Sequence, residues 1–186
     1  MLNNYIDQTF DRKDEFLKGE YENCTFNNCD FSEMDLSDFK FSDCYFSNCN
    51  LSLVPLGNTS FQHVKFKGCK MLGLRFEDCN TFGLSFSFEE CQLNHCSFYN
   101  LKVKKTVFKN SNLQEAYFPQ SDLSGAVFEN CNLALAIFDG TILEKADFRT
   151  AYNYSIDPQI NKIKKAKFSV AGIAGLLDKH DIHIEM

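Results

Sequence analysis

Residues 21–32 read YENCTFNNCDFS, and Tyr21, Phe26 and Phe31 within them lie five residues apart. The two residues that follow each aromatic are polar in this stretch, and the position two residues before Phe26 and Phe31 is a cysteine. An α-helix repeats about every 3.6 residues and a strand every second residue, so a period of five is typical of neither element alone. It indicates an internal repeat instead.

The period of five extends through most of the chain. A first series of centres steps from Phe16 to Phe86, and thirteen of its fifteen members are Phe, Leu or Met. A second series, offset by two residues, runs from Phe88 to Phe148 and is apolar throughout. Together they contain sixteen of the twenty Phe in the chain. The excess of Phe therefore marks one repeated inward position.

The position two residues before each centre holds a small side chain. All nine cysteines occupy it, and Ala, Ser or Thr fill it in later repeats. Neighbouring cysteines are five residues apart with no His in register, unlike the short paired spacing of zinc sites, so we expect no metal. Disulfides between thiols twenty residues apart, such as Cys24 and Cys44, are the alternative to buried free thiols that pack as small apolar residues. The nine cysteines are Cys24, Cys29, Cys44, Cys49, Cys69, Cys79, Cys91, Cys96 and Cys131.

A five-residue unit with one large and one small inward side chain cannot bury its apolar side alone, so successive units must stack. Units such as Cys24-Thr25-Phe26-Asn27-Asn28, Ser121-Asp122-Leu123-Ser124-Gly125 and Ala146-Asp147-Phe148-Arg149-Thr150 resemble the pentapeptide-repeat family over roughly residues 14 to 150. The resemblance implies an all-β solenoid, a right-handed quadrilateral β-helix of about seven coils of four pentapeptides. At about 4.8 Å per coil, the rod would be roughly 34 Å long, close to one turn of B-form DNA.

The repeats divide the chain into three parts: an N-terminal lead-in (1–13), the β-helix (14–150) and a C-terminal cap (151–186). The register slips between Phe86 and Phe88, which predicts a bulge or small protrusion at 80–90, with Phe82 as an alternative to Thr81 for the inward centre. Around Pro55 the motif also weakens, which indicates a bent corner or a contact patch.

The C-terminal cap is expected to close the last coil, because an exposed edge of a stacked sheet invites aggregation. Ser169 resembles the N-cap of a helix over about 170–179, whose stripe of Val170, Ile173, Ala174 and Leu177 would cover the coil. Residues 181–185 alternate like a short strand. The candidate cap or dimer contacts are Val170, Ile173, Leu176, Leu177, Ile182 and Ile184. Two alternatives follow from the sequence: these residues form a dimerisation element, or they only cover the end of a monomer.

Composition argues against several classes of protein. The net charge of -6 is unlike that of a direct nucleic-acid binder. Neither a secretory signal nor an apolar run long enough to cross a membrane is present, and we expect a cytoplasmic protein with reduced thiols. No phosphate-binding, dinucleotide-binding or nucleophile motif occurs, and His63 and His95 fall on outward positions. We therefore expect neither an enzyme nor a cofactor.

The exterior carries the remaining signal, because residues 20–50 hold seven acidic side chains against Lys40 alone. Asp38, Asn58 and Asp78 are twenty residues apart and should stack on one side of the coil. The candidate partner-binding acidic surface consists of Asp30, Glu33, Asp35, Asp38, Asp43, Glu77 and Asp78. A solvated surface that keeps a repeat protein dispersed is the alternative interpretation.

The segment 21–32, together with Leu176-Leu177 and the Ile-rich tail, is similar to Qnr-type quinolone-resistance and microcin-immunity proteins. That resemblance implies a DNA mimic that binds DNA gyrase or topoisomerase IV and modulates it, or protects it from quinolones or toxins. It also implies a homodimer that joins through the C-terminal end. The alternative is a structural or protein-interaction module with no topoisomerase partner.

Overall fold

The computed structural model describes residues 3–183. Within them the chain forms short parallel strands and three 3-10 helices. The strands are β1 (Asn3–Ile6), β2 (Thr9–Asp11), β3 (Gly19–Glu22), β4 (Thr25–Asn27), β5 (Lys40–Ser42), β6 (Tyr45–Ser47), β7 (Ser60–Gln62), β8 (Val64–Lys67), β9 (Phe86–Glu89), β10 (Val107–Lys109) and β11 (Val127–Glu129). The 3-10 helices are η1 (Phe76–Asp78), η2 (Ile173–Leu176) and η3 (Asp178–His180).

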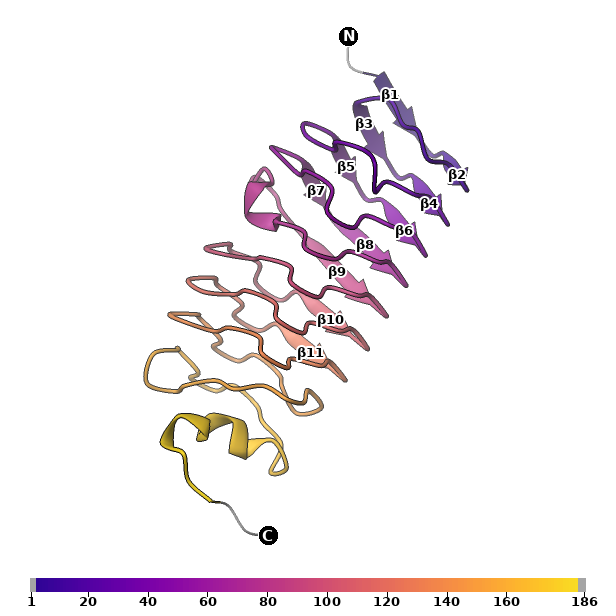
Figure 1. The fold of residues 1–186 in the computed structure, drawn as a ribbon. Coiled ribbons are helices and arrows are strands. Elements are labelled where there is room, and N and C mark those ends of the chain that lie inside the picture. Colours follow the sequence, from indigo (N-terminus) through magenta and orange to yellow (C-terminus); the bar gives the residue numbers. More distant parts are fainter. Residues whose placement is uncertain (1–2, 184–186) are drawn as a thin grey trace.

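The strands stack into a four-sided β-helix, as the period of five predicts (Figure 1). The first side is the sheet β1-β3-β5-β7, and the second side is the sheet β2-β4-β6-β8-β9-β10-β11. Isolated parallel bridges such as Asp30↔Asn50 join the third side, whose centres include Phe31 and Leu51, and bridges such as Arg75↔Ser97 join the fourth side, whose centres include Leu36 and Phe76. The seven strands of the second side are separated by six turns, close to the expected seven coils.

A continuous column of nine phenylalanine rings runs through the core behind the second side. Each ring stacks on the next, with centroids between 4.5 Å apart (Phe26 and Phe46) and 5.4 Å apart (Phe66 and Phe88). Such offset stacking adds to the burial of apolar area, which is the main stabilising contribution. The column consists of Phe10, Phe26, Phe46, Phe66, Phe88, Phe108, Phe128, Phe148 and Phe168.

The small inward position is also confirmed, because all nine cysteines are buried and none forms a disulfide. Seven of the thiols donate to backbone carbonyls of the neighbouring coil, as Cys44 Sγ does to the Tyr21 carbonyl at 3.3 Å. Burial raises the pKa of Cys44 to about 12 and that of Cys131 to about 11. These thiols are packing residues and weak nucleophiles.

The corners of the coil explain the polar residues that follow each centre. Asn28, Asn48 and Gly68 stack at one corner with φ of 53°, 53° and 61°. Gly and Asn tolerate this left-handed conformation better than other residues do. Leu53 and Leu135 occupy equivalent corners with φ of 62° and 59°, and their side chains are 75% and 71% exposed. The chain around Pro55 otherwise stays in register, since Val54 and Leu56 are buried.

The register slip produces a bulge over Asn80–Ser85, inside the predicted range. Val64 pairs with Phe86, twenty-two residues later, so two residues are extra in this coil. Neither Thr81 nor Phe82 is an inward centre: Thr81 is exposed, and Phe82 is 83% exposed at the tip of the bulge. Leu84 packs against the core in their place. The insertion is therefore absorbed on the first side, between the hydrogen bonds from Asn80 to Thr59 and from Ser85 to Phe61, before β9 begins.

The β-helix extends beyond 14–150 at both ends, which corrects the predicted boundaries. β1 and β2, in the expected lead-in, pair in parallel with β3 and β4. At the other end, Ile142 bridges Lys162, and Phe168 completes the ring column. The spacing between stacked aromatics at the N-terminus is sixteen residues (Phe10 to Phe26) instead of twenty, which hid the first coil from a search for regular repeats.

The predicted capping helix over 170–179 is wrong, because η2 and η3 form two short 3-10 turns there. The carbonyl of Gly175 accepts a hydrogen bond from Ile156 N at 2.8 Å, and a Cβ at Gly175 would collide with the carbonyl oxygen of Tyr154. This close backbone approach, together with the low helix propensity of Gly172 and Gly175, disfavours a regular helix. Asp181–His183 form no strand, and Ile184 and Glu185 lie outside the described residues.

Three of the four side chains expected to cover the last coil face solvent, and only Leu177 is half-buried. Val170 is 90% exposed, and Ile173 and Ala174 face solvent as well. Leu176 packs against the core instead. The predicted stripe follows the 3.6-residue period of an α-helix. In 3-10 turns residues three apart align instead, so a different set of side chains points inward.

Candidate functional site

The seven acidic residues predicted as a partner-binding surface are spread over three sides of the rod. Asp30 and Glu33 lie on the third side. Four others, namely Asp35, Asp38, Glu77 and Asp78, belong to the fourth side, and Asp43 follows β5 at the end of the first. Six of the seven are exposed, whereas Glu77 is half-buried and one of its carboxylate oxygens is buried without a hydrogen-bond partner among the described residues. The structure thus brings together four of the seven on one side.

Asp38 and Asp78 are linked through Asn58 between them. The Asn58 side chain donates to Asp38 Oδ1 at 2.9 Å, and its backbone N–H donates to the Asp78 carbonyl at 2.8 Å. Lys18 Nζ also contacts Asp38 Oδ2 at 3.2 Å, and Arg75 Nε lies 3.4 Å from carboxylates of both Glu77 and Asp78. Part of the negative charge of the fourth side is therefore balanced by neighbouring cations.

Local hydrogen bonds keep several of these carboxylates ionised. The Ser32 backbone N–H and hydroxyl donate to Asp30 and lower its pKa. Hydrogen bonds from Ser37 do the same for Asp35. The side chains of Asn58 and Lys18 lower the pKa of Asp38. The surface consequently retains its negative charge under mildly acidic conditions.

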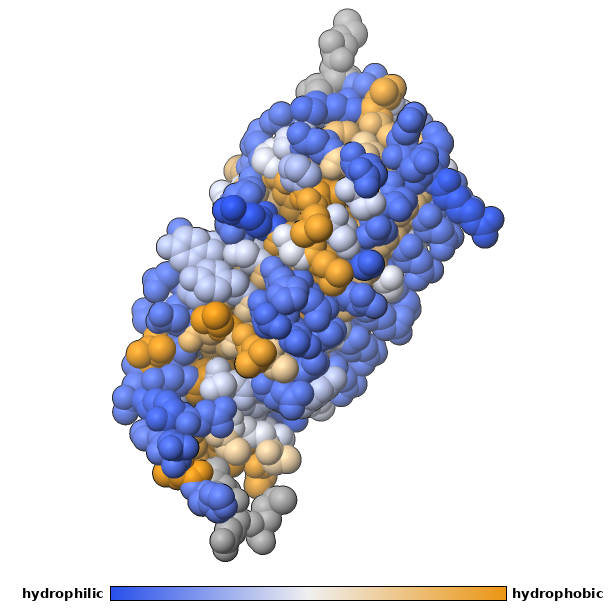
Figure 2. Space-filling model, in the orientation of Figure 1, coloured by the Kyte–Doolittle hydropathy of each residue, from blue (hydrophilic) through white to orange (hydrophobic). Residues whose placement is uncertain are grey.

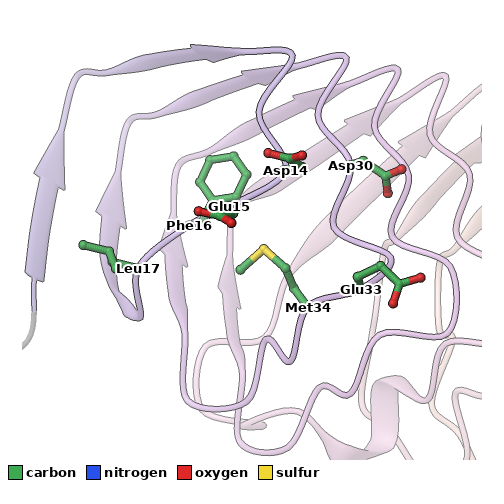
Figure 3. A pocket seen from close by; sticks show the side chains of 7 residues that line it. All are labelled: Asp14, Glu15, Phe16, Leu17, Asp30, Glu33 and Met34. Carbon is green, nitrogen blue, oxygen red and sulfur yellow. The ribbon is translucent and has the colours of Figure 1, made fainter.

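An acidic hollow of about 700 Å³ opens at the N-terminal end of the rod. We define it by its lining residues, Asp14, Glu15, Phe16, Leu17, Asp30, Glu33 and Met34. Phe16 and Met34 point toward one another across it, and Asp30 and Glu33 belong to the next coil (Figure 3). Only Asp30 and Glu33 of this set were predicted from sequence, because the hollow depends on the irregular first coil.

The C-terminal half of the first side carries the opposite charge. Lys102 bridges Asp122, which bridges Ile142 and then Lys162, so residues twenty apart form columns on this side. Seven exposed lysines gather there against the carboxylates of Asp122 and Glu144, and Lys104 pairs with Asp122 at 3.1 Å. We call this the lysine side: Lys102, Lys104, Lys105, Lys145, Lys162, Lys164 and Lys165.

Exposed apolar side chains gather on the fourth side below Arg75. Tyr99 and Tyr117 lie with ring centroids 6.1 Å apart, and Ile137 bridges Tyr117 in the next coil. With Leu135 at the adjoining corner they form the tyrosine patch. Hydrophobic atoms are visible among polar ones in both halves of the rod (Figure 2). Sequence analysis missed this patch because its members are outward residues of separate repeats.

Of the predicted cap and dimer contacts, the structure places five. Val170, Ile173 and Ile182 are exposed, whereas Leu176 and Leu177 are half-buried. Ile184 lies outside the described residues. The cap is attached to the rod by Lys179 Nζ, which contacts Asp157 Oδ1 at 2.7 Å.

Among residues 3–183 no group of three or more His, Cys, Asp or Glu side chains could hold a metal ion. No helix in the same range is long and apolar enough to cross a membrane.

The fold and its repeats identify the class of protein. Sequence profiles described as "Pentapeptide repeat region" and "Pentapeptide repeats (8 copies)" match residues 20–87 and 111–149. The chain belongs to the pentapeptide-repeat family. No curated protein matches it in sequence.

Solved structures of QnrB1 share the fold at low sequence identity, and HetL is a weaker structural match. A trypsin-treated form of QnrB1, described as a plasmid-mediated fluoroquinolone resistance protein, is 21% identical with a TM-score of 0.51, over 98% of this chain and 97% of that one. Full-length QnrB1 is 19% identical with a TM-score of 0.50, over 97% and 100%. HetL, involved in heterocyst differentiation regulation in the cyanobacterium Nostoc sp. strain PCC 7120, is 14% identical with a TM-score of 0.48, over 90% and 84%.

Proposed function

We propose that this chain is a non-enzymatic, cytoplasmic DNA mimic that binds DNA gyrase or topoisomerase IV. In this role it modulates the enzyme or protects it from quinolones or toxins. The observation that carries the proposal is that Asp35, Asp38, Glu77 and Asp78 lie on one side of the rod, in coils that stack on one another. The fold shared with QnrB1 supports the same role.

The charge distribution along the rod decides which part would enter a basic, DNA-binding groove. Residues 1–100 contain fifteen acidic and eight basic side chains, whereas residues 101–186 contain ten acidic and eleven basic ones. The N-terminal half therefore has a net charge of -7 and the C-terminal half +1. Outward carboxylates would steer the N-terminal half to the groove, and this attraction weakens as salt rises.

A supercoiling assay with purified gyrase, with and without a quinolone, tests the proposal. We expect inhibition of supercoiling or recovery of activity in the presence of the drug. The double variant Asp38→Asn/Asp78→Asn should weaken binding, whereas Asp139→Asn/Glu129→Gln, with the same change in net charge, should not. Absence of inhibition, of protection and of binding at low salt would reject a topoisomerase partner.

A protein-interaction module without a topoisomerase partner is the second candidate. It is favoured by the tyrosine patch, whose four apolar side chains are exposed on the fourth side. Large exposed apolar groups that gather on one surface commonly mark a contact with another protein. If gyrase does not bind, this patch is the surface to substitute first, with Tyr117→Ser and Ile137→Ser.

We further propose a homodimer that joins through the C-terminal cap. Val170, Ile173 and Ile182 are exposed there and apolar, which supports a contact with a second copy. Sedimentation equilibrium of the wild-type chain should show a dimer, and Val170→Glu should shift it to monomer because a charge would be buried at the contact. A monomer at all concentrations would leave these residues as solvent-exposed parts of the cap.

A further inference from the structure

The acidic hollow exists because the first coil lacks one side. Phe10 stacks on Phe26 after sixteen residues and Phe16 stacks on Phe31 after fifteen, whereas later coils need twenty, or twenty-two at the bulge. Leu17 and Lys18 pass directly from the third side to β3 on the first side. The missing pentapeptide would have covered Met34, which is the first inward residue of the fourth side.

The shortened link is held firmly, so the hollow is a preformed feature. Tyr21 Oη donates to the Leu17 carbonyl at 2.7 Å, and Asn3 Nδ2 donates to the Lys18 carbonyl at 2.9 Å. Gly19 in the same link packs directly against Asn3, where a Cβ would collide with the Asn3 carbonyl oxygen. Only glycine permits this approach.

The hollow combines an apolar floor with an acidic rim. Phe16 and Met34 are half-buried against the core, and Leu17 beside them is exposed. Asp14, Glu15, Asp30 and Glu33 also line the hollow and are exposed. The carboxylates of Asp30 and Glu33 point outward from the next coil at the margin of the hollow (Figure 3).

The nearby cations do not neutralise the rim. Lys18 Nζ is engaged by Asp38, and Lys13 Nζ lies over the Phe10 ring at 5.5 Å from its centroid. None of the four rim carboxylates has an ion-pair partner among the described residues. Lys70 attracts Asp30 without forming an ion pair, so the hollow keeps a net negative charge next to apolar surface.

We propose that the hollow binds an extended, basic and apolar segment of a partner protein, with a Lys or Arg side chain seated in it. The aliphatic stem of such a side chain would cover Phe16 and Met34 while its cation contacts the carboxylates of the rim. The flexible side chain of Met34 can adjust its conformation to the bound Lys or Arg side chain. The volume of about 700 Å³ is ample for one such side chain and its apolar neighbours. This site does not depend on gyrase being the partner.

A fluorescein-labelled peptide that alternates leucine and lysine is the probe. We expect it to bind the full chain, and a peptide with glutamate for lysine or with serine for leucine to bind far more weakly. The double variant Asp30→Asn/Glu33→Gln should reduce affinity about tenfold, because two charge contacts are lost. Asp139→Asn/Glu129→Gln carries the same change in net charge away from the hollow and should bind like the wild type.

Methionine methyl NMR locates the binding. Met34 lines the hollow, whereas Met71 is fully buried in the core and serves as an internal control. The Met34 signal, assigned with Met34→Leu, should shift on addition of the peptide while that of Met71 stays in place. Equal binding of the serine peptide, equal loss in the control double variant, or an unmoved Met34 signal would each overturn the proposal. These outcomes are read without gyrase, so they are separate from the supercoiling result.

Discussion

The ring of Phe108 stacks on the ring of Phe128 with centroids 5.0 Å apart and planes 6° from parallel. Both rings are fully buried in the middle of the nine-ring column. Phe108→Ala should therefore leave a cavity and lower the free energy of unfolding by about 3–5 kcal/mol. Urea unfolding followed by circular dichroism measures this change.

Phe82→Ala is the matched control, because Phe82 is 83% exposed on the bulge. Its free energy of unfolding should stay within about 0.5 kcal/mol of the wild type. Similar losses in the two variants would contradict the assignment of the column as the main source of stability.

Leu135→Asn should stabilise the rod. Leu135 adopts φ of 59°, which is unfavourable for leucine, and its side chain is 71% exposed. The substitution therefore lowers the cost of this backbone conformation and loses little buried apolar area. Asn is tolerated in this region, and a gain of roughly 0.5–1 kcal/mol in the free energy of unfolding is expected. Leu135→Ala, which keeps the strain, should give no gain in the same thermal or urea measurement.

The thiols should be inert in the folded protein. All nine are buried and therefore shielded from a reagent in solution. For Cys44 and Cys96, burial also raises the pKa to about 12, so the reactive thiolate is scarce. At pH 8, iodoacetamide should leave all nine cysteines unmodified by mass spectrometry and alkylate all nine in urea. Lys104→Cys, at an exposed position, should be labelled in the folded protein. Rapid labelling of native cysteines would show that the coils open.

The contact between Asp157 and Lys179 should make the cap sensitive to acid. The hydrogen bond from Lys179 lowers the pKa of Asp157 in the folded state. Its contribution to stability is therefore complete above the ordinary Asp pKa of about 4 and is lost as the pH falls through the lower folded value.

Hydrogen exchange of residues 172–180, compared with that of β10, measures this loss. Lys179→Met should expose the cap already at neutral pH and remove the acid dependence. Identical exchange in the wild type and the variant at every pH would show that other contacts hold the cap.

The regular part of the fold could be predicted from sequence because its signal is repeated. Each Phe such as Phe108 and each small residue such as Cys131 recurs at a fixed spacing, and both are buried. The stacking of Asp38, Asn58 and Asp78 follows from the same regular spacing, because one coil contains twenty residues. Repetition thus allowed outward as well as inward positions to be assigned along the coils.

The remainder depends on single contacts that no repeat encodes. The acidic hollow follows from a coil shortened around Leu17, and the cap departs from a helix because Gly175 meets the backbone of Tyr154. The lysine side joins residues as distant as Lys102 and Lys162, which are outward members of separate repeats that stack every twenty residues. Total charge does not disclose such segregation.

The bulge at Phe82 and Gly83 also has a practical consequence. It adds two residues while Phe88 still stacks on Phe66 at 5.4 Å, so the scaffold accepts extra chain here without transmitting the change. The tip is consequently a suitable attachment point for a fluorophore, a surface tether or a displayed peptide. A reporter placed there would leave both ends of the molecule unobstructed.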